Sequence, residues 1–516
     1  MFYKCTQITT LNLSNFETSQ VTDMSNMFGA CNALTTIYVS DKFTIDKVTS
    51  DDSMFGFCNN LKGASSHQIG NWNKNYANYH TGYFSYGINT VDDLKTFANK
   101  VNGTYTPAEG ETATPSYTAI CAGLMANITL PDADNMPAIG SSGYSGTFDG
   151  CGHSISGLSF QSTSALFAKN GGMIRNLGIV NANIAAEANG YLCQTNEGTI
   201  KNCFFMGKTT GSSQSASGIC QTNNGTITNC YYLADSETDA IEGTTYKTTA
   251  QFKSGEVAYL LSQGTEGSVW GQQLGTDDYP VLSDYKVIKA AKGDKDANNN
   301  DTYWATFSNQ NSDATLLVPS ARNLNVYNAT VSNGTMTLKM RIDSQVAKGE
   351  GVLLKTDGEY VNVKANKTNG LKAVDYTDNN LVATPATEET INAETGYTLY
   401  RLTYNKVSTK EGLGFYLGLV KDENGKVDET SLGKKLKATP GKAYLKVSPG
   451  AAAPARGFVF PCDDETTGIG EIVIEGDAGI SGTANANDRI YNLQGQQIST
   501  PVKGIYIKNN KKVIIK

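Results

Sequence analysis

The stretch FDGCGHSISG, residues 148–157, holds the side chains of this sequence that come nearest to an acid/base pair. Asp149 and His153 are four residues apart, and a carboxylate with an imidazole could exchange protons during cleavage of a glycosidic bond. The same residues also suit a turn, in which Asp149 accepts backbone N–H bonds and His153 occupies a corner. We favour the turn, because residues 165–182 carry only Lys169 and Arg175 as further charges.

The stretch DKDANNND, residues 294–301, has the alternating acidic and polar residues of a calcium-binding loop. It lacks the later glutamate of an EF-hand, so a calcium site and a plain polar loop both stay open. The ten cysteines include no C-x-x-C pair and only three histidines occur, which argues against zinc. No G-x-S-x-G, H-E-x-x-H or phosphate-binding glycine loop is present. We therefore assign no catalytic, cofactor or metal residue and expect a protein without enzymatic activity.

Length and charge restrict the kinds of partner. The chain has 516 residues, enough for several folded units, and a net charge of −7 with a pI near 5.2. An acidic chain without a clustered basic face is not suited to nucleic acid. No run of about 18 apolar residues is present, so we expect no membrane-spanning helix. The 52 glycines are typical of many short strands joined by tight turns.

An internal repeat of 26 and then 27 residues covers residues 1–61. Cys5, Cys31 and Cys58 align, and the short L-x-L and I-x-V pieces predict one strand in each coil of a solenoid. Each coil exposes polar side chains, which we expect to be those of Asn15, Thr18, Ser19 and Thr22. Because the chain starts within a coil, we expect the natural N-terminus and a signal peptide to lie upstream.

A second array, with spacings of 26 and 27 residues, covers residues 165–232. Each copy has an apolar strand, an N-x-G corner and a T-I-x-N-C strand, which predicts a right-angled β-solenoid. Ile174, Ile200 and Ile227 share an inward position, with an asparagine two residues after each, near a turn. Lys201 and Thr228 would lie on the exposed face. The aligned cysteines fit buried packing, or a disulfide between coils about 4.8 Å apart.

Two helical patterns flank the second array. Apolar residues recur at helical spacing in residues 91–101, behind a Thr90 N-cap with Asp93 three positions on. We expect this helix to cover an open end of the second solenoid. Residues 252–263 predict another short helix, after which Trp270 and Tyr279 would seal the other end.

The rest of the chain changes character. Residues 284–462 contain alternating runs separated by Gly, Pro and Asn, which predicts an antiparallel β-sandwich or barrel. We interpret residues 463–485 as a linker and residues 486–516 as a small module of strands. The fold class is therefore mainly β, with solenoid repeats in residues 1–80 and 81–283 followed by antiparallel sheets.

Several segments resemble known families. Residues 11–31, LNLSNFETSQVTDMSNMFGAC, resemble the BspA-type leucine-rich repeat of bacterial surface proteins, although the third copy has Asp51 where Met24 is expected. The second array, with its lead-in GTFDGCGHSISGL, is similar to the GLUG-type repeat of bacterial adhesins. Residues 303–338 resemble an uncharacterised β domain of similar proteins. The end of the chain resembles the C-terminal module that Bacteroidota use for type IX-like export, on the residues Tyr491, Gly495, Gly504, Tyr506 and Lys516.

The resemblances imply a location outside the cell more than a chemistry. They favour a non-enzymatic surface or secreted adhesin that binds a host protein or a polysaccharide through its solenoid faces. The C-terminal module implies export machinery as a second partner. Two alternatives stay open: a carbohydrate-active β-helix enzyme, either lyase or glycosidase, and a structural stalk that holds a missing N-terminal domain.

Overall fold

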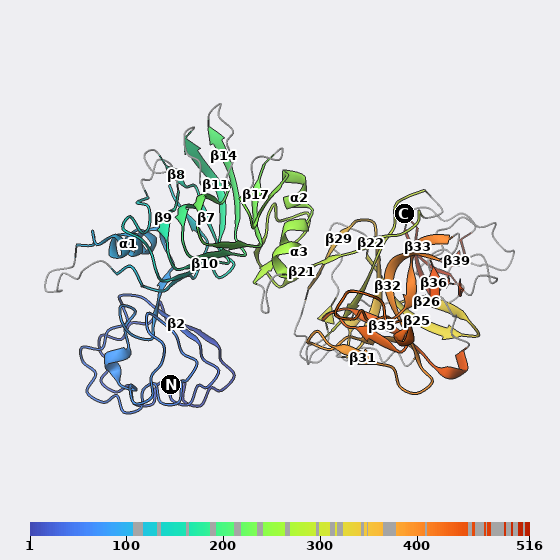
Figure 1. Cartoon of the computed structure of the whole chain (residues 1–516), viewed down its shortest axis with the longest axis horizontal. Coiled ribbons are helices and arrows are strands. Elements are labelled where there is room, and N and C mark those ends of the chain that lie inside the picture. Colours follow the sequence, from blue (N-terminus) through green and yellow to red (C-terminus); the bar gives the residue numbers. More distant parts are fainter. Residues whose placement is uncertain are drawn as a thin grey trace.

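The computed structural model consists of short β-strands along most of the chain, with the solenoid on one side and antiparallel sheets on the other (Figure 1). The expected fold class is confirmed. The structure describes residues 1–106, 117–131, 136–160, 165–185, 192–210, 218–234, 241–263, 269–295, 299–309, 315–316, 324–341, 345–347, 349–364, 378–407, 410–451, 457–459, 469–470, 472–475, 490–491, 497–498, 504–508 and 511–515.

One row of buried side chains runs through consecutive coils of the solenoid. The row joins residues that lie in register on adjacent parallel strands: Val39, Tyr86, Ala122, Phe148, Ile174, Ile200 and Ile227. Each of these residues is at most 5% exposed. Stacking removes them from water, which stabilises the fold by about 1.5–3 kcal/mol for each large side chain. The inward position predicted for the three isoleucines is confirmed.

That row belongs to an eight-stranded parallel sheet which unites the two repeat arrays. In sheet order its strands are β1 (Thr10–Asn12), β2 (Thr36–Val39), β3 (Ser85–Ile88), β4 (Ala122–Leu124), β6 (Thr147–Asp149), β10 (Met173–Arg175), β13 (Thr199–Lys201) and β16 (Thr226–Thr228). The repeats alone indicate two arrays. The structure joins them in one sheet, because β3 and β4, which lie outside both repeats, pair with β2 and β6.

Two further parallel sheets complete the coils. The seven-stranded sheet contains β5 (Ile128–Thr129), β7 (Ser154–Ser156), β8 (Ser159–Phe160), β11 (Gly178–Ala185), β14 (Phe204–Thr210), β17 (Cys230–Leu233) and β18 (Thr244–Lys247). The three-stranded sheet contains β9 (Phe167–Asn170), β12 (Cys193–Asn196) and β15 (Cys220–Asn223). Cys193 and Cys220 lie in register, and the nine cysteines among the described residues are free thiols. Of the two interpretations, packing as free thiols is therefore the one that this structure shows for the described cysteines.

Asparagines occupy the turns at which each coil passes from one sheet to the next. Asn176, Asn202 and Asn229 have φ values of 52°, 53° and 53°, a left-handed conformation that asparagine tolerates. Asn202 Nδ2 donates to Asn176 Oδ1 at 3.4 Å, and Asn229 Nδ2 donates to Asn202 Oδ1 at 2.9 Å. A second ladder of side-chain amides links Asn170, Asn196 and Asn223. The predicted placement of asparagines at turns is confirmed for the first set.

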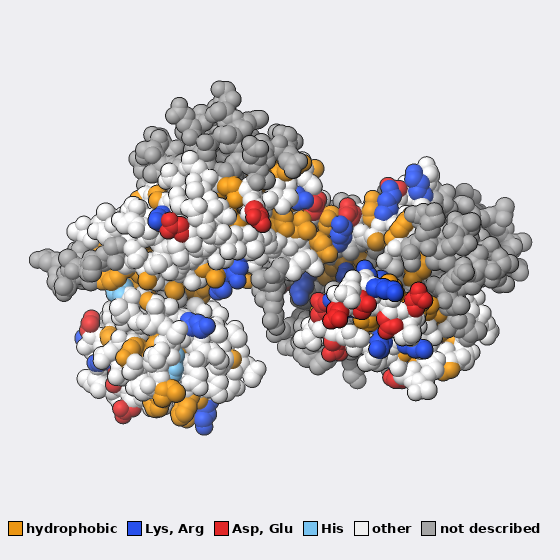
Figure 2. Space-filling view, viewed as in Figure 1, with side chains coloured by type: hydrophobic (Ala, Val, Ile, Leu, Met, Phe, Trp, Pro, Cys, Tyr) orange, Lys and Arg blue, Asp and Glu red, His pale blue; other side chains and the backbone are white. Residues whose placement is uncertain are grey.

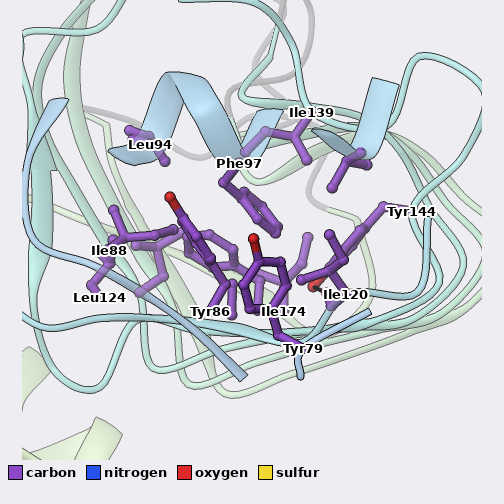
Figure 3. Close-up of a cluster of buried hydrophobic side chains, with 14 of the residues drawn as sticks. Tyr79, Tyr86, Ile88, Leu94, Phe97, Ile120, Leu124, Ile139, Tyr144 and Ile174 are labelled. Carbon is purple, nitrogen blue, oxygen red and sulfur yellow. Dashed lines mark hydrogen bonds between the residues drawn. The ribbon is translucent and has the colours of Figure 1, made fainter. Parts of the chain in front are cut away.

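Helix α1 (Val91–Asn102) has the predicted N-cap, since Asp93 N donates to Thr90 Oγ1 at 3.1 Å and Thr90 N donates to Asp93 Oδ2 at 3.0 Å. Phe97 points from α1 into the apolar interior of the coils (Figure 3). Its ring lies 6.3 Å from Tyr86 and 5.9 Å from Tyr144. The helix thus packs where the arrays join. It does not cover an open end, because the sheet continues beyond β3 through β2 and β1.

The second helical pattern forms α2 (Thr249–Lys253) and α3 (Glu256–Gln263), followed by the hairpin of β19 (Trp270–Gly271) and β20 (Val281–Leu282). The Trp270 ring lies 5.1 Å from Phe204, and its Nε1 donates to Asn202 O at 3.1 Å. The prediction that Trp270 seals the solenoid end is wrong. Trp270 covers the outer side of the seven-stranded sheet, because Val180 and Phe204 project there and need apolar cover.

The antiparallel region consists of three stacked sheets: a central sheet and one outer sheet packed on each of its faces. The central strand β28 (Gly351–Thr356) alternates its side chains between two cores. Val352 and Leu354 pack with Val361 of one outer sheet, while Leu353 packs with Phe415 of the other. The predicted antiparallel sandwich is therefore confirmed, with a third layer added.

The strands of the three layers have the following bounds. The first outer sheet contains β21 (Tyr285–Lys289), β29 (Tyr360–Lys364), β24 (Thr315–Leu316) and β27 (Gln345–Val346). The central sheet contains β22 (Ala291–Lys292), β23 (Tyr303–Ser308), β28, β25 (Leu324–Ser332), β26 (Thr335–Met340) and β38 (Ile472–Glu475). The second outer sheet contains β30 (Leu381–Ala383), β35 (Ala443–Val447), β32 (Thr398–Val407), β33 (Lys410–Leu417), β36 (Gly457–Val459) and β37 (Ile469–Gly470).

Short elements complete the fold. β31 (Thr390–Asn392) pairs with β34 (Lys435–Lys437), and the 3₁₀ turns are η1 (Lys74–Tyr76), η2 (Glu429–Ser431) and η3 (Pro449–Ala451). The linker interpretation of residues 463–485 needs correction, because β37 and β38 lie within it and pair with β36 and β26. The run Ile472–Glu475 is β-branched at three positions, which suits an added edge strand. The last sheet has the order β40 (Gln497–Ile498), β39 (Ile490–Tyr491), β41 (Gly504–Lys508) and β42 (Lys511–Ile515).

Candidate functional surfaces

The outer side of the eight-stranded sheet carries a row of polar residues beside the buried row. On the last four strands this row consists of Asp149, Arg175, Lys201 and Thr228, in register on adjacent coils. Neighbouring strands lie about 4.8 Å apart, so the side chains repeat at that interval. Asp149 is 7% exposed, whereas Thr228 is exposed. The row therefore passes from a buried acid to the half-buried Lys201 and the exposed Thr228, so the predicted exposure holds fully only for Thr228.

Asp149 has a structural set of partners. Its carboxylate accepts hydrogen bonds from Arg175 Nε at 2.6 Å, Asn176 Nδ2 at 3.0 Å and Cys151 N at 2.8 Å. The bond from Cys151 N confirms the turn role predicted for this residue. Burial opposes the charge on Arg175, but the neighbouring carboxylate outweighs burial and raises the pKa of Arg175. The carboxylate thus holds the Arg175 side chain in place.

His153 does not join Asp149. Its Nδ1 lies 3.3 Å from Asn127 Oδ1, and burial lowers its pKa. Within the described part of the chain, no hydrogen bond connects His153 with the carboxylate of Asp149. Asp149 and His153 therefore use separate sets of partners at this turn.

Tyr38, in the first array, contacts the segment that lies between the two arrays in sequence. Its hydroxyl lies 3.5 Å from Cys151 Sγ, and its ring lies over Gly123, where an added Cβ would stand 2.5 Å from Tyr38 Cε1. Burial raises the pKa of Tyr38 well above its ordinary value. Sequence reasoning missed this contact. The available signal was a glycine inside the strand of AGL, which often marks a close approach of other groups.

The open part of the row contains two of the predicted binding residues. Lys201 and Thr228 lie directly opposite each other, beside Thr199 and Thr226 in the adjacent outward row. Lys201 forms no salt bridge among the described residues. Ammonium and hydroxyl groups in this arrangement can donate hydrogen bonds to an extended partner that lies across several coils.

The predicted polar line of the first array is only partly exposed. Asn15 and Thr22 are exposed and Ser19 is half-buried, with its N–H bonded to Glu17 Oε1 at 3.1 Å. The prediction that Thr18 is exposed is wrong, since the residue is 5% exposed.

The hydroxyl of Thr18 serves the backbone of the next coil. Its Oγ1 donates to Thr44 O and accepts from Thr44 N, both at 2.7 Å. The buried threonine hydroxyl thus satisfies two backbone groups of the adjacent coil. The structure does not bring the line of Asn15, Ser19 and Thr22 onto the strands that carry Lys201 and Thr228.

A buried polar cluster, which sequence reasoning also missed, lies where α1 meets the first array. Lys100 is 6% exposed, and its Nζ lies 3.3 Å from Asp41 Oδ1 and 3.1 Å from the hydroxyl of Tyr79. The Tyr79 hydroxyl donates to Asp41. Burial and the nearby carboxylate raise the pKa of Tyr79, so this hydroxyl stays protonated. The cluster connects three segments of the chain through hydrogen bonds and stabilises their packing.

A groove of about 700 Å³ lies between the seven-stranded sheet, α2 and the turn that precedes β20. Met206, Leu233 and Tyr279 line it, with the ion pair of Lys253 and Asp278 at 3.0 Å in its wall. Tyr279 is therefore a groove residue and does not seal an end of the solenoid. The groove lies on the seven-stranded sheet, whereas Lys201 lies on the eight-stranded sheet.

The solenoid surface visible in Figure 2 carries few charged side chains, while Asp, Glu, Lys and Arg are frequent on the antiparallel region. No cluster of metal-ligating residues occurs among the described residues. The candidate calcium loop lies partly outside them, at residues 296–298. None of the described helices combines the length and the apolar character needed to cross a bilayer.

The C-terminal segment, residues 486–516, is described in part. Tyr491 lies in β39, and Gly504 and Tyr506 lie in β41, and these two strands pair antiparallel. Gly495 and Lys516 lie outside the described residues.

Residues 1–103 are similar to a family described as a Mycoplasma protein of unknown function, DUF285. No curated protein and no solved structure shows a significant match to the chain. The similarity covers β1 to α1, that is, the first repeat array and the helix after it. The chain is thus a β-solenoid repeat protein with a DUF285-like first segment.

Proposed function

We propose that this chain is a secreted or surface-attached adhesin-type protein without enzymatic activity. It binds an extended host protein or polysaccharide through the outer row of Lys201 and Thr228. One observation carries the proposal: polar side chains lie in register on successive coils, beside outward Thr199 and Thr226, and Lys201 has no ion pair within the part of the chain that the structure describes. A rigid row with a fixed interval suits a polymer with repeated hydrogen-bonding groups.

The proposed location outside the cell draws support from resemblance. The first repeat array resembles BspA-type repeats and the second is similar to GLUG-type repeats, both of bacterial surface proteins. The last strands, β39 to β42, resemble the type IX-like export module of Bacteroidota. The mostly uncharged solenoid face in Figure 2 also suits hydrogen bonding to glycans or protein backbone.

A binding experiment tests the function. The full chain is immobilised and exposed to a panel of polysaccharides and extracellular-matrix proteins, and product release from each polysaccharide is measured in parallel. We expect at least one ligand to bind and no polysaccharide to be cleaved. Cleavage would support the carbohydrate-active enzyme, and absence of both binding and cleavage would support the stalk.

Two substitutions test the face. Lys201→Glu reverses the charge of the row, and Thr228→Arg places a large side chain on it; we expect each to weaken binding at least tenfold. Lys169→Gln is the matched control, since Lys169 lies on the three-stranded sheet and pairs with Glu197 at 2.9 Å. Unchanged melting curves show that the fold is intact. Equal binding by all variants would place the ligand elsewhere.

A further inference from the structure

A pocket of about 340 Å³ lies in the antiparallel region, lined by β23, β32 and the turn before β35. Four cationic side chains line it, and no Asp or Glu does so among the described residues. These cations are Lys289, Arg401, Lys437 and Lys442. A concave site lined by charge of one sign concentrates ligands of the opposite sign.

Two of the four cations already have acidic partners. Lys289 Nζ lies 3.1 Å from Glu359 Oε1, and Lys437 pairs with Glu388. Arg401 and Lys442 form no ion pair within the described part of the chain. Arg401 Nε is buried and has no hydrogen-bond partner among the described residues. A buried donor without a partner costs about 1–3 kcal/mol, which a bound acceptor would recover.

The turn that carries Lys442 is fixed in place. Thr384 Oγ1 donates to Lys442 O at 2.9 Å and accepts from Lys442 N at 3.2 Å. Ser308 N donates to Gly441 O at 3.1 Å, which ties the same turn to β23. Burial lowers the pKa of Lys442, which is half-buried in this turn. The backbone that carries the lysine is thus fixed before any ligand arrives.

Threonines and aromatic residues complete the lining: Thr306, Thr403, Trp304 and Tyr444. Trp304 and Tyr444 are 3% and 8% exposed, so little of either ring is open to the pocket. Threonines beside cationic side chains suit a sugar ring that carries an acidic group, because threonine hydroxyls can bond to the hydroxyls of the sugar. The volume lies at the low end of the range for ligand sites, about 300–1,000 Å³, and fits a single sugar residue.

We propose that this pocket binds an anionic sugar residue. Arg401 and Lys442 contact its carboxylate or sulfate group, and the threonine hydroxyls bond to its ring hydroxyls. The pocket is separate from the row of Lys201 and Thr228. Its ligand binding can therefore be tested independently of binding at the solenoid face.

Calorimetric titration of the full chain tests the proposal with four probes: sodium glucuronate, N-acetylglucosamine 6-sulfate, uncharged N-acetylglucosamine and inorganic sulfate. We expect at least one charged sugar to bind, at least tenfold more tightly than the neutral sugar. Glucuronate alone would identify a carboxylate site, and the sulfated sugar alone would identify a sulfate site. Equal affinity for neutral and charged sugars, or for inorganic sulfate and the sulfated sugar, would overturn the proposal.

Substitutions separate binding from folding. Lys442→Met should lower affinity at least tenfold and raise the Tm, because it removes a half-buried charge that has no ion pair among the described residues. Lys442→Arg keeps the charge and should retain binding. Lys446→Met is the matched control, since Lys446 lies in the same strand, β35, and pairs with Glu394 at 2.7 Å. Wild-type affinity in Lys442→Met, or an equal loss in Lys446→Met, would contradict the assignment.

Discussion

Arg175 Nε donates a hydrogen bond to Asp149 Oδ2 at 2.6 Å, and the two residues lie in register on adjacent coils. This pair begins the outer row of the solenoid. Asp149 also accepts from Asn176, whose corner ladder continues through Asn202 to Asn229 and ends at the carbonyl of Leu261 in α3. One acid thus anchors two sets of contacts at the joint of the arrays.

Removal of the Asp149 carboxylate should destabilise the solenoid, because the role of this residue is structural. In Asp149→Ala, Arg175 loses its partner and Cys151 N loses its acceptor, so we expect a loss of about 1–3 kcal/mol in unfolding free energy. Urea denaturation followed by circular dichroism measures this change. The conservative Asp149→Asn should lose less, because it can still accept from the backbone. Unchanged stability in Asp149→Ala would contradict the anchoring role.

The buried row predicts a large effect at Ile200, which is 0% exposed. Ile200→Asp removes an apolar side chain and places an acid without a partner between Ile174 and Ile227, so we expect a loss of more than about 3 kcal/mol. Thermal melting of the purified chain reports the effect. Ile200→Val serves as the control and should cost only about 0.5–1.5 kcal/mol. An unchanged melting curve for Ile200→Asp would mean that the residue faces solvent.

The joint between the arrays can be tested at Gly123. An alanine there would place its Cβ 2.5 Å from the Tyr38 ring, so Gly123→Ala should destabilise the chain by about 1–3 kcal/mol. Gly171→Ala is the control within the same solenoid, because its Cβ would meet only Tyr144 O at 3.6 Å. Limited proteolysis with mass spectrometry should show earlier cleavage near the joint in Gly123→Ala. Similar stability of the two variants would argue against the Tyr38 contact.

His80 predicts an acid-sensitive step. Burial, with Lys100 nearby, lowers the pKa of His80 from 6.5 to about 4 in the folded chain. Between these two pH values the unfolded chain binds a proton at His80 more readily than the folded chain does. The stability that neutral His80 contributes is therefore complete above pH 6.5 and is lost as the pH falls toward 4. We expect the Tm to fall over this range and to fall less in His80→Phe.

The phenylalanine of His80→Phe keeps an aromatic ring beside Tyr117, whose ring centroid lies 4.1 Å from that of His80. Only the titrating group is then removed. Melting curves of both proteins across the pH range make the comparison. Parallel curves would assign the acid sensitivity to other groups.

The export proposal predicts a change of location. Deletion of residues 486–516 should leave the protein inside the cell of the producing bacterium, because the segment resembles an export address. Cell fractionation and surface labelling of intact cells measure this. A variant with Lys446→Met, which leaves residues 486–516 intact, should reach the surface as the wild type does. Normal surface display of the truncated chain would refute the proposal.

Local patterns were sufficient to predict part of this fold. The isoleucine row and the Thr90 cap depend on residues close in sequence or repeated at a fixed interval, so periodicity and capping rules find them. The joint of the arrays was not predictable, since β3 and β4 lie outside both repeats and pair through backbone groups. The burial of Thr18 likewise depends on Thr44, in the next coil.

The candidate sites also differ in whether a local sequence pattern could predict them. Lys201 and Thr228 were predicted to share a face because the repeat places them in equivalent positions, and their register confirms that placement. Arg401 and Lys442 come from different strands and turns, without a motif that connects them. Their proximity depends on how the outer sheet packs against the central one, which no local pattern encodes.

The asparagine ladders have a consequence for how such a chain can vary in length. Every corner from Asn176 to Asn229 uses the same side chain, the same backbone conformation and a bond to the corner before it. The corners themselves would therefore accept a duplicated or deleted coil. The segment that covers the seven-stranded sheet would not, because Val269 lies beside Gly152, just before β7, while Trp270 packs on Phe204 of β14. A change in the number of coils would thus require a matching change in the length of this covering segment.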